Sequence, residues 1–226
     1  MIYLKQTIHI PAYLNFQYVL KMAKGTYFMW AADDDERDEH FIKTCVENIG
    51  NHTSIMTSSV IKYRRSDRIV KAKIPKFKSN NQYQNLYAHL QKMSPYLFYG
   101  LHRREDILWV LEMTEFYDWF DVYFINRNIL TNGFKLLPDY NGFTIGVDAE
   151  KYIVKPCNNR LEYMSFGRNN LNLILHSDRL NILQKAALTY RSLKSMLRLV
   201  SHHEKIHKIK AAVYLLKKLK TGNGAL

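Results

Sequence analysis

The 226-residue sequence has few of the residues that interrupt or cross-link a chain: nine glycines, five prolines and two cysteines. So few glycines and prolines exclude a long low-complexity linker, and a hydrophobic content of 47% excludes a chain that stays unfolded. Cys45 and Cys157 lie far apart and show neither the CxxC nor the Cys/His spacing of a structural zinc site. The sequence therefore predicts a packed domain with reduced thiols, as in a cytoplasmic protein.

Long apolar runs are also missing. No stretch approaches the ~20 consecutive apolar residues that a membrane-spanning helix requires. The first residues do not show the basic segment followed by an apolar one that marks a secretion signal. We therefore expect no membrane span and a cytoplasmic location, with any membrane association peripheral and at the inner face.

Acidic residues are in the minority, with 20 Asp and Glu against 33 Lys and Arg. The excess is local, because the segment 185–220 contains ten basic residues and one acidic residue, whereas the rest of the chain contains 23 and 19. No RNA-recognition or helix-turn-helix pattern accompanies the basic segment, so nucleic acid is the less favoured partner. We divide the chain into a domain at 1–170 and a basic helical extension at 171–226.

Alternating helical and strand patterns predict an α/β fold with a mixed sheet flanked by helices. The run 26–32 is apolar on both faces, which is typical of a central strand covered by helices on each side. Gly25 and Gly50 follow two helical patterns, at positions suited to left-handed C-terminal caps. The other patterns predict helices at 14–24, 41–49, 86–93, 107–113 and 122–130, strands at 53–63, 68–74, 97–101 and 134–137, and an irregular or edge segment at 141–153.

The extension begins with a helix for which Ser177 is the expected N-cap, and a second basic helix is expected at 206–219. The first helix has an apolar stripe, formed by Leu183, Ala187, Tyr190, Leu193, Leu197 and Val200. One interpretation packs this helix on the domain and leaves its basic residues solvated. The other places the helices on an anionic membrane surface, which Leu188, Leu193 and Leu197 would enter beside the lysines.

Three adjacent aspartates, Asp33, Asp34 and Asp35, follow the predicted central strand. The carboxyl edge of an α/β sheet is where ligands bind, and alternation along a strand would turn Asp33 and Asp35 the same way. Two carboxylates on one side suit Mn²⁺ or Mg²⁺, which would bridge a diphosphate. The alternative is a solvated acidic loop whose charges only favour the helix that follows.

The stretch with these aspartates is VLKMAKGTYFMWAADDD, and with Asn15 and Phe16 before it, it resembles the middle of the nucleotide-binding half of glycosyltransferase family 2, which has the GT-A fold. The resemblance implies that Asn15, Asp33 and Asp34 hold the nucleotide-sugar and that Asp33, Asp34 and Asp35 hold the metal. It extends more weakly through YLFYGLHRRED and FYDWFDVYFINRNILTNG, over about residues 1–155.

The last of these stretches matches the part of the family that carries the general base. The resemblance implies Asp121 as the base and Asp118 as the second choice, with inversion at the anomeric carbon. A carboxylate within hydrogen-bond reach of the acceptor hydroxyl takes its proton while the metal stabilises the departing diphosphate. From the residues alone, a helix N-cap and a first-turn acid are the favoured roles of the two aspartates.

The sequence departs from the family in two ways. It lacks the early elements that hold the nucleotide base and begins at what resembles the third strand, residues 2–6, which predicts an N-terminally incomplete sheet. It also lacks the QxxRW motif of processive synthases. We therefore expect addition of single sugars to a glycan or lipid-linked acceptor, in surface glycan or polysaccharide synthesis. The alternative is a catalytically incomplete fragment that acts as a basic membrane- or nucleic-acid-binding module.

Overall fold

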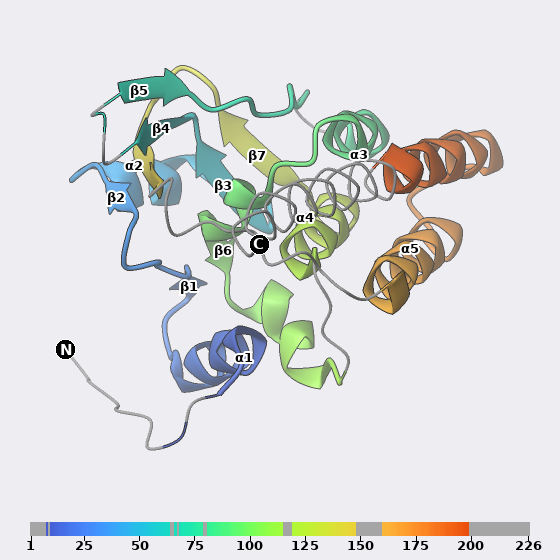
Figure 1. The fold of residues 1–226 in the computed structure, drawn as a ribbon, viewed down its shortest axis with the longest axis horizontal. Helices are drawn as coiled ribbons and strands as arrows, with labels where there is room; N and C mark the ends of the chain where they lie inside the picture. The colour runs from blue at the N-terminus through green and yellow to red at the C-terminus, as the bar shows by residue number, and fades with distance from the viewer. Residues whose placement is uncertain are drawn as a thin grey trace, which may run out of the picture.

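The first of two sheets carries the candidate site. The computed structural model describes residues 8, 10–63, 66, 68–78, 81–114, 119–147 and 160–198. The sheet has the strand order β1 (Tyr27–Phe28), β6 (Leu101–Arg103), β3 (Ser54–Thr57) and β7 (Phe134–Leu137) (Figure 1). β6 is antiparallel to both of its neighbours, and β3 and β7 are parallel. β1, β3 and β7 therefore run in the same direction and end at the same edge.

The second sheet has the order β2 (Glu36–Arg37), β8 (Phe143–Val147), β4 (Ser59–Tyr63) and β5 (Arg68–Lys71). Ser58 alone separates β3 from β4, and its amide donates to the Leu137 carbonyl at 2.9 Å. The run 53–63, predicted as one strand, therefore supplies a strand to each sheet. β8 lies inside this sheet between β2 and β4, so residues 143–147 correct the expectation of an irregular or edge segment.

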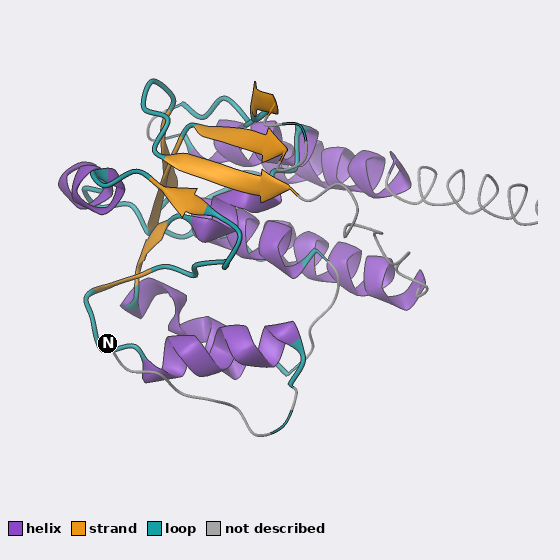
Figure 2. Ribbon diagram, turned by 60° about the vertical axis from the view of Figure 1, so that its left-hand side comes forward, coloured by secondary structure: helices purple, strands orange, loops and turns teal. Residues whose placement is uncertain are grey.

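Helices cover the first sheet on both faces. The α-helices are α1 (Ala12–Met22), α2 (Phe41–Asn48), α3 (Gln82–Gln91), α4 (Phe120–Leu130), α5 (Arg160–Leu175) and an unlabelled helix at 182–198, and the 3-10 helices are η1 (Pro95–Tyr99) and η2 (Glu105–Glu112). α2 contacts β3 and β6, and α4 contacts β7. Figure 2 shows α2 on one side of the strands and the longer helices on the other. This arrangement confirms the predicted α/β fold with mixed sheets flanked by helices.

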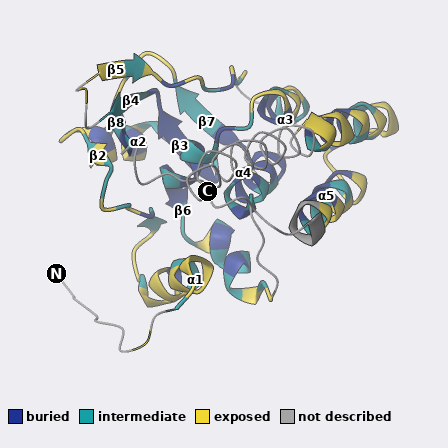
Figure 3. Cartoon of the chain, viewed as in Figure 1, coloured by how far each residue is buried: buried dark blue, intermediate teal, exposed yellow. Residues whose placement is uncertain are grey.

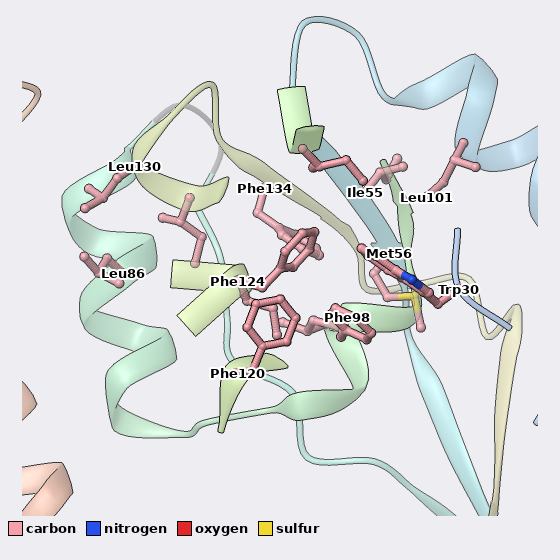
Figure 4. Packing of buried hydrophobic residues seen from close by; sticks show 14 of the residues in the cluster. Trp30, Ile55, Met56, Leu86, Phe98, Leu101, Phe120, Phe124, Leu130 and Phe134 are labelled. Atoms are coloured by element: carbon pink, nitrogen blue, oxygen red, sulfur yellow. The ribbon is translucent and has the colours of Figure 1, made fainter. Parts of the chain in front are cut away.

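The centre of the core is aromatic. The Trp30 ring stacks on Phe98 with centroids 4.2 Å apart and meets Phe124 edge-on at 5.3 Å. Figure 4 shows these rings together with Ile55 and Met56, which come from β3. Burial of each such side chain contributes about 2–3 kcal/mol relative to exposure. The aromatic runs of the sequence are therefore largely core, and they join η1, α4 and the segment after β1.

The run 26–32 does not form the predicted central strand. Only Tyr27–Phe28 pair, and they form one edge of the sheet that the described strands build. Pairing stops because the chain turns to bury Trp30, which is 3% exposed and donates its indole N–H to the Phe16 carbonyl at 3.2 Å. The Trp30 carbonyl accepts from the Arg37 guanidinium at 2.9 Å instead of from a neighbouring strand.

Several other element boundaries differ from the prediction. The predicted strand at 97–101 is η1 followed by β6, since Pro95 at the start favours a helical turn. The helix expected at 107–113 is the 3-10 helix η2, and the strand expected at 68–74 ends at Lys71. α1 ends in an extended cap at Ala23, so Gly25 is not its left-handed cap, whereas Gly50 has the predicted positive φ of 54°. The strand at 2–6 and the helix at 206–219 lie outside the described residues.

The helix at 182–198 does not turn its apolar stripe toward the domain, which is what packing through that stripe would require. Leu188 is fully buried, and Ser195 Oγ donates to the Leu90 carbonyl of α3 at 2.6 Å. The predicted stripe faces outward, since Leu183 is 78%, Tyr190 67% and Leu197 70% exposed. Figure 3 colours exposed residues yellow, and much of the helix beside α3 has this colour. The helix therefore packs on the domain through its polar face. The boundary predicted at residue 170 falls inside α5, and no helix of the described residues is long and apolar enough to cross a membrane.

Candidate functional site

The three aspartates lie where the chain passes from the first sheet to the second. Asp33 and Asp34 form a turn after β1, and Asp35 leads directly into β2. Strand alternation therefore does not orient them, which corrects the argument that Asp33 and Asp35 face one way. The carboxyl ends of β1, β3 and β7 share one edge of the first sheet, and Asp33 follows the end of β1 by five residues rather than directly as predicted.

The three carboxylates differ in their surroundings. Asp35 Oδ1 accepts a hydrogen bond from the Gly146 amide of β8 at 3.2 Å, which fixes Asp35 to the second sheet. Asp33 is exposed, and Asp34 is half-buried. Asp33 is consequently the carboxylate most open to a ligand, while Asp35 anchors the turn. α2 has no acidic residue in its first turn, but Asp38, which precedes that helix, accepts from the amide of the N-cap residue His40 at 2.9 Å. The acidic segment therefore also contacts the start of α2, which is the role that the alternative interpretation gave it.

Arg37 stabilises the segment around the acidic turn, although no sequence motif indicated a role for it. Its Nη2 donates to the Trp30 carbonyl at 2.9 Å, and its guanidinium lies over the Phe143 ring at 5.0 Å. Burial lowers the pKa of Arg37, and the nearby Asp35 charge opposes that shift. An arginine stays charged at neutral pH even so. Its buried Nε has no hydrogen-bond partner among the described residues, so one donor beside the turn is unsatisfied.

Asp121 lies in the first turn of α4, directly after an unusual backbone conformation. Trp119 is the N-cap residue and has φ 73° and ψ 18°, a left-handed conformation that is rare for a bulky side chain. Asp121 Oδ1 accepts from the Val122 amide at 2.7 Å, and the positive end of the helix dipole favours the ionised carboxylate there. Strained backbone of this kind concentrates at functional sites. Asp118 lies outside the described residues.

One ring, Phe98, connects the two acidic segments. It stacks on Trp30, three residues before Asp33, and meets Phe120, which precedes Asp121, with centroids 6.0 Å apart. Figure 4 shows the three rings in one cluster. The structure thus brings the acidic turn and the start of α4 to a common aromatic support, although the two segments are almost 90 residues apart in the sequence.

Asn15 is attached to the same support through its neighbour. Phe16 meets Phe98 with ring centroids 5.2 Å apart, and its carbonyl accepts from Trp30. The Asn15 side chain is exposed. Asn15 lies within the first turn of α1, whose N-cap is Pro11, so it does not itself open the helix.

The carboxylates at the acidic turn supply only some of the ligands that a hard cation such as Mg²⁺ requires. Among the described residues, no group of three or more His, Cys, Asp or Glu side chains is arranged to hold a metal ion. Mg²⁺ in nucleotide sites is commonly bound by one or two carboxylates, with phosphates and waters completing its shell. Asp33, which is exposed, and its neighbour Asp34 fit that pattern as two adjacent carboxylates.

The mixed sheets, the helices on both faces and the acidic turn at the carboxyl edge form a glycosyltransferase-like fold. Among solved structures, the chain is similar to TarS of S. aureus, a glycosyltransferase crystallised as residues 1–349 in complex with UDP-GlcNAc. The TM-score is 0.54 and the identity 15% over 79% of this chain, which shows a common fold. The match covers 51% of the TarS chain, so this chain spans about half of that length. Neither a protein-family model nor a curated protein sequence matches.

Proposed function

We propose that the chain is a glycosyltransferase domain that moves a sugar from a nucleotide-sugar to an acceptor hydroxyl. The observation that carries the proposal is the shared aromatic support of the acidic turn and of Asp121, at the carboxyl edge of a glycosyltransferase-like sheet. TarS, which has this fold, was solved with UDP-GlcNAc. A nucleotide-sugar is therefore the donor that we propose here, with a glycan or lipid-linked acceptor, single addition and inversion at the anomeric carbon.

In this proposal the acidic turn holds the diphosphate end of the donor. Asp33 and Asp34 would bind Mn²⁺ or Mg²⁺, which neutralises the charge of the leaving diphosphate when bound. Asp35 and Arg37 keep the turn in place through Gly146 and the Trp30 carbonyl. Asn15, on the neighbouring start of α1, is assigned to the nucleotide. Fixing these groups before the donor arrives reduces the reorganisation that the reaction requires.

Asp121 is assigned as the general base. A carboxylate that accepts the proton of the acceptor hydroxyl makes that oxygen a better nucleophile toward the anomeric carbon. Attack on the face opposite to the diphosphate then inverts the configuration at that carbon. The hydrogen bond from the Val122 amide fixes the orientation of the Asp121 carboxylate at the start of α4.

Two substitutions separate the roles of binding and transfer. Asp33→Asn should weaken Mn²⁺-dependent binding of a UDP-sugar about tenfold, the effect of losing one charged contact. Asp121→Asn should leave that binding intact and lower transfer by about 100-fold, since a general base contributes at least that factor. Asp178→Asn, which changes an exposed aspartate elsewhere in the chain, is the matched control.

Isothermal titration measures donor binding, and release of labelled UDP measures transfer to water or an added glycan. If the unmodified chain binds no UDP-sugar in the presence of Mn²⁺, the proposed function is wrong. If Asp121→Asn turns over at the normal rate, the base is not Asp121, and Asp118 becomes the residue to replace.

We also propose that the helix at 182–198 rests on an anionic membrane surface. Its exposed stripe includes Leu183, Tyr190 and Leu197, and Lys194 and Arg198 lie beside that stripe at helical spacing. Apolar side chains next to lysine and arginine suit the interface of an anionic bilayer, whereas in a helix pair related by two-fold symmetry these charges would repel. Leu188, which we expected to enter the membrane, is buried against the domain and is removed from that surface.

Vesicle flotation tests this surface. The full chain should float with vesicles of phosphatidylcholine and phosphatidylserine and should not float with phosphatidylcholine alone. Leu183→Gln/Leu197→Gln should abolish flotation, while Ile42→Gln/Ile69→Gln, which changes exposed apolar residues of α2 and β5, should not. Equal flotation of the two double variants would exclude the helix as the membrane contact.

A further inference from the structure

A pocket of about 450 Å³ lies between the segment that follows β5 and the carboxyl ends of β3 and β7. In Figure 1 that segment crosses from β5 toward α3 along the top of the view. Four lysines line the pocket, and its apolar lining includes Ile74, Phe77 and Leu136. The lysines are Lys71, Lys73, Lys76 and Lys92. The described residues that line it include no aspartate or glutamate.

The four positive charges are available to a ligand. All four lysines are exposed, and within the described part of the chain none forms an ion pair. Lys62 and Lys43, by contrast, lie 3.8 and 4.0 Å from glutamates. Charges of one sign that line a concave surface raise the local concentration of oppositely charged ligands. The positive charge of the pocket therefore favours the binding of an anion.

Ser58 supplies a second and independent observation. Its side chain is 0% exposed and lines the pocket, and its buried Oγ has no hydrogen-bond partner among the residues that the structure describes. An unsatisfied buried hydroxyl costs roughly 1–3 kcal/mol, which a ligand oxygen in the pocket would recover. The backbone of Ser58 is already satisfied, since its amide donates to Leu137 and its carbonyl accepts from the Thr57 hydroxyl.

The pocket opens at the sheet edge where β1 ends, and the acidic turn follows β1 by five residues. Ser58 follows β3 and Pro138 follows β7, and both strands end at the edge where β1 ends. β3 is two positions from β1 in the sheet, which places the two strands about 10 Å apart. A ligand of a few sugar units is long enough to span that separation.

We propose that this lysine pocket binds the acceptor and that the acceptor is an anionic saccharide carrying phosphate or carboxylate groups. The proposal rests on the proposed function, because it assigns the pocket to the second substrate of that reaction. Lysine presents a compact charge without the planar fork of arginine, so the pocket selects for negative charge more than for the shape of the anionic group. The apolar side chains are suited to the carbon faces of sugar rings.

Binding of simple probes tests the pocket without catalysis. Glucose 6-phosphate and glucuronate serve as the phosphate and carboxylate probes, and glucose as the neutral one, each titrated at low salt and followed by amide NMR shifts. Both anions should shift the amides of Ser58 and Ala72, while glucose should not. Lys73→Gln/Lys76→Gln should weaken anion binding about tenfold, and the control Lys21→Gln/Lys43→Gln should leave it unchanged. Glucose binding as tightly as the anions would overturn the proposal.

Ser58→Ala gives a variant that is expected to fold. Since the hydroxyl has no partner, its removal should not lower the melting temperature, yet it should weaken anion binding severalfold. Anion affinity that is unchanged both in Ser58→Ala and in the lysine variant would overturn the proposal. Binding of a UDP-sugar to the lysine variant should equal that of the unmodified chain. Absence of donor binding in every chain would instead contradict the proposed function, so the two failures are distinguishable.

Discussion

Two histidines inside the core make the stability of this protein sensitive to mild acid. His89 and His102 are both 0% exposed, and burial lowers the pKa of each to about 4. His102 Nε2 lies 2.9 Å from the Phe98 carbonyl, which can only accept, so Nε2 carries the proton. Nδ1 then accepts from the Ser54 hydroxyl at 2.8 Å. A second proton on the ring would force that hydroxyl to accept and would leave its own hydrogen without this acceptor.

His89 is held neutral in a similar way. Its Nε2 accepts from the Ser94 amide at 3.3 Å, and its Nδ1 donates to Asn126 Oδ1 at 2.7 Å. The Asn126 amide donates to Asn170 of α5, so this histidine joins α3 to α4 and α5. A proton on Nε2 would make this nitrogen a donor that faces the N–H donor of Ser94, and the hydrogen bond between them would be lost. The folded state therefore resists protonation at both rings.

The sign and size of the effect follow from these shifts. In the unfolded chain each histidine binds a proton near pH 6.5, and in the folded chain only near pH 4. Stability is therefore fully present above pH 6.5 and falls as the pH drops through the window from 6.5 to 4. Between pH 7 and pH 5 we expect a loss of about 2 kcal/mol per histidine, or about 4 kcal/mol for the pair. That is a large part of the stability of an ordinary domain.

Urea unfolding of the full chain at pH 7, 6 and 5 measures the loss. His89→Gln and His102→Gln should each remove about half of the pH dependence. The control His40→Gln/His176→Gln, which changes two exposed histidines, should retain it. NMR titration of the folded protein gives a direct check that does not depend on the variants. Ring signals of His89 or His102 that titrate at or above pH 6.5 would refute the reasoning.

Two further predictions concern the packing. Gly100→Ala would place a methyl group 2.4 Å from the Ile55 carbonyl of β3, so β3 and β6 must separate. We expect the free energy of unfolding, measured by urea titration, to fall by about 3 kcal/mol. An unchanged urea midpoint would contradict the close approach of the two strands. Burial raises the pKa of Cys45 to about 12, so its thiol should react slowly at pH 8. In a Cys157→Ser chain, maleimide should therefore label Cys45 only as fast as the protein unfolds, which mass spectrometry follows. Rapid labelling of the native chain would show that the thiol is accessible.

Local patterns predicted those parts of the fold that local forces decide. The strand at 134–137 has its predicted bounds, and the helix expected at 41–49 is observed with Gly50 in the left-handed conformation. In these segments apolar periodicity and glycine conformational freedom act over a few residues. The acidic turn at Asp33 and Asp34 also followed from the sequence, because an acidic run after an apolar one is itself a local signal.

The route that the chain takes around that turn was decided by tertiary contacts. The composition of the run 26–32 predicts a strand over its whole length. Packing of Trp30 against Phe98 and Phe124 nevertheless stabilises the fold more than further pairing with β6 would. Arg37 and Gly146 support the turn from elements that no motif connects to it.

The sequence by itself determined the α/β class, the acidic turn at the sheet edge and the concentration of positive charge near the C-terminus, since each depends on residue types within a short window. Only the tertiary structure decided that Phe98 joins the turn to Asp121, that Ser58 and four lysines share a pocket, and that the stripe at 183–197 faces outward. The stripe shows the reason most clearly. Periodicity identifies the apolar face of a helix, but the direction of that face depends on which surface of the domain the helix meets.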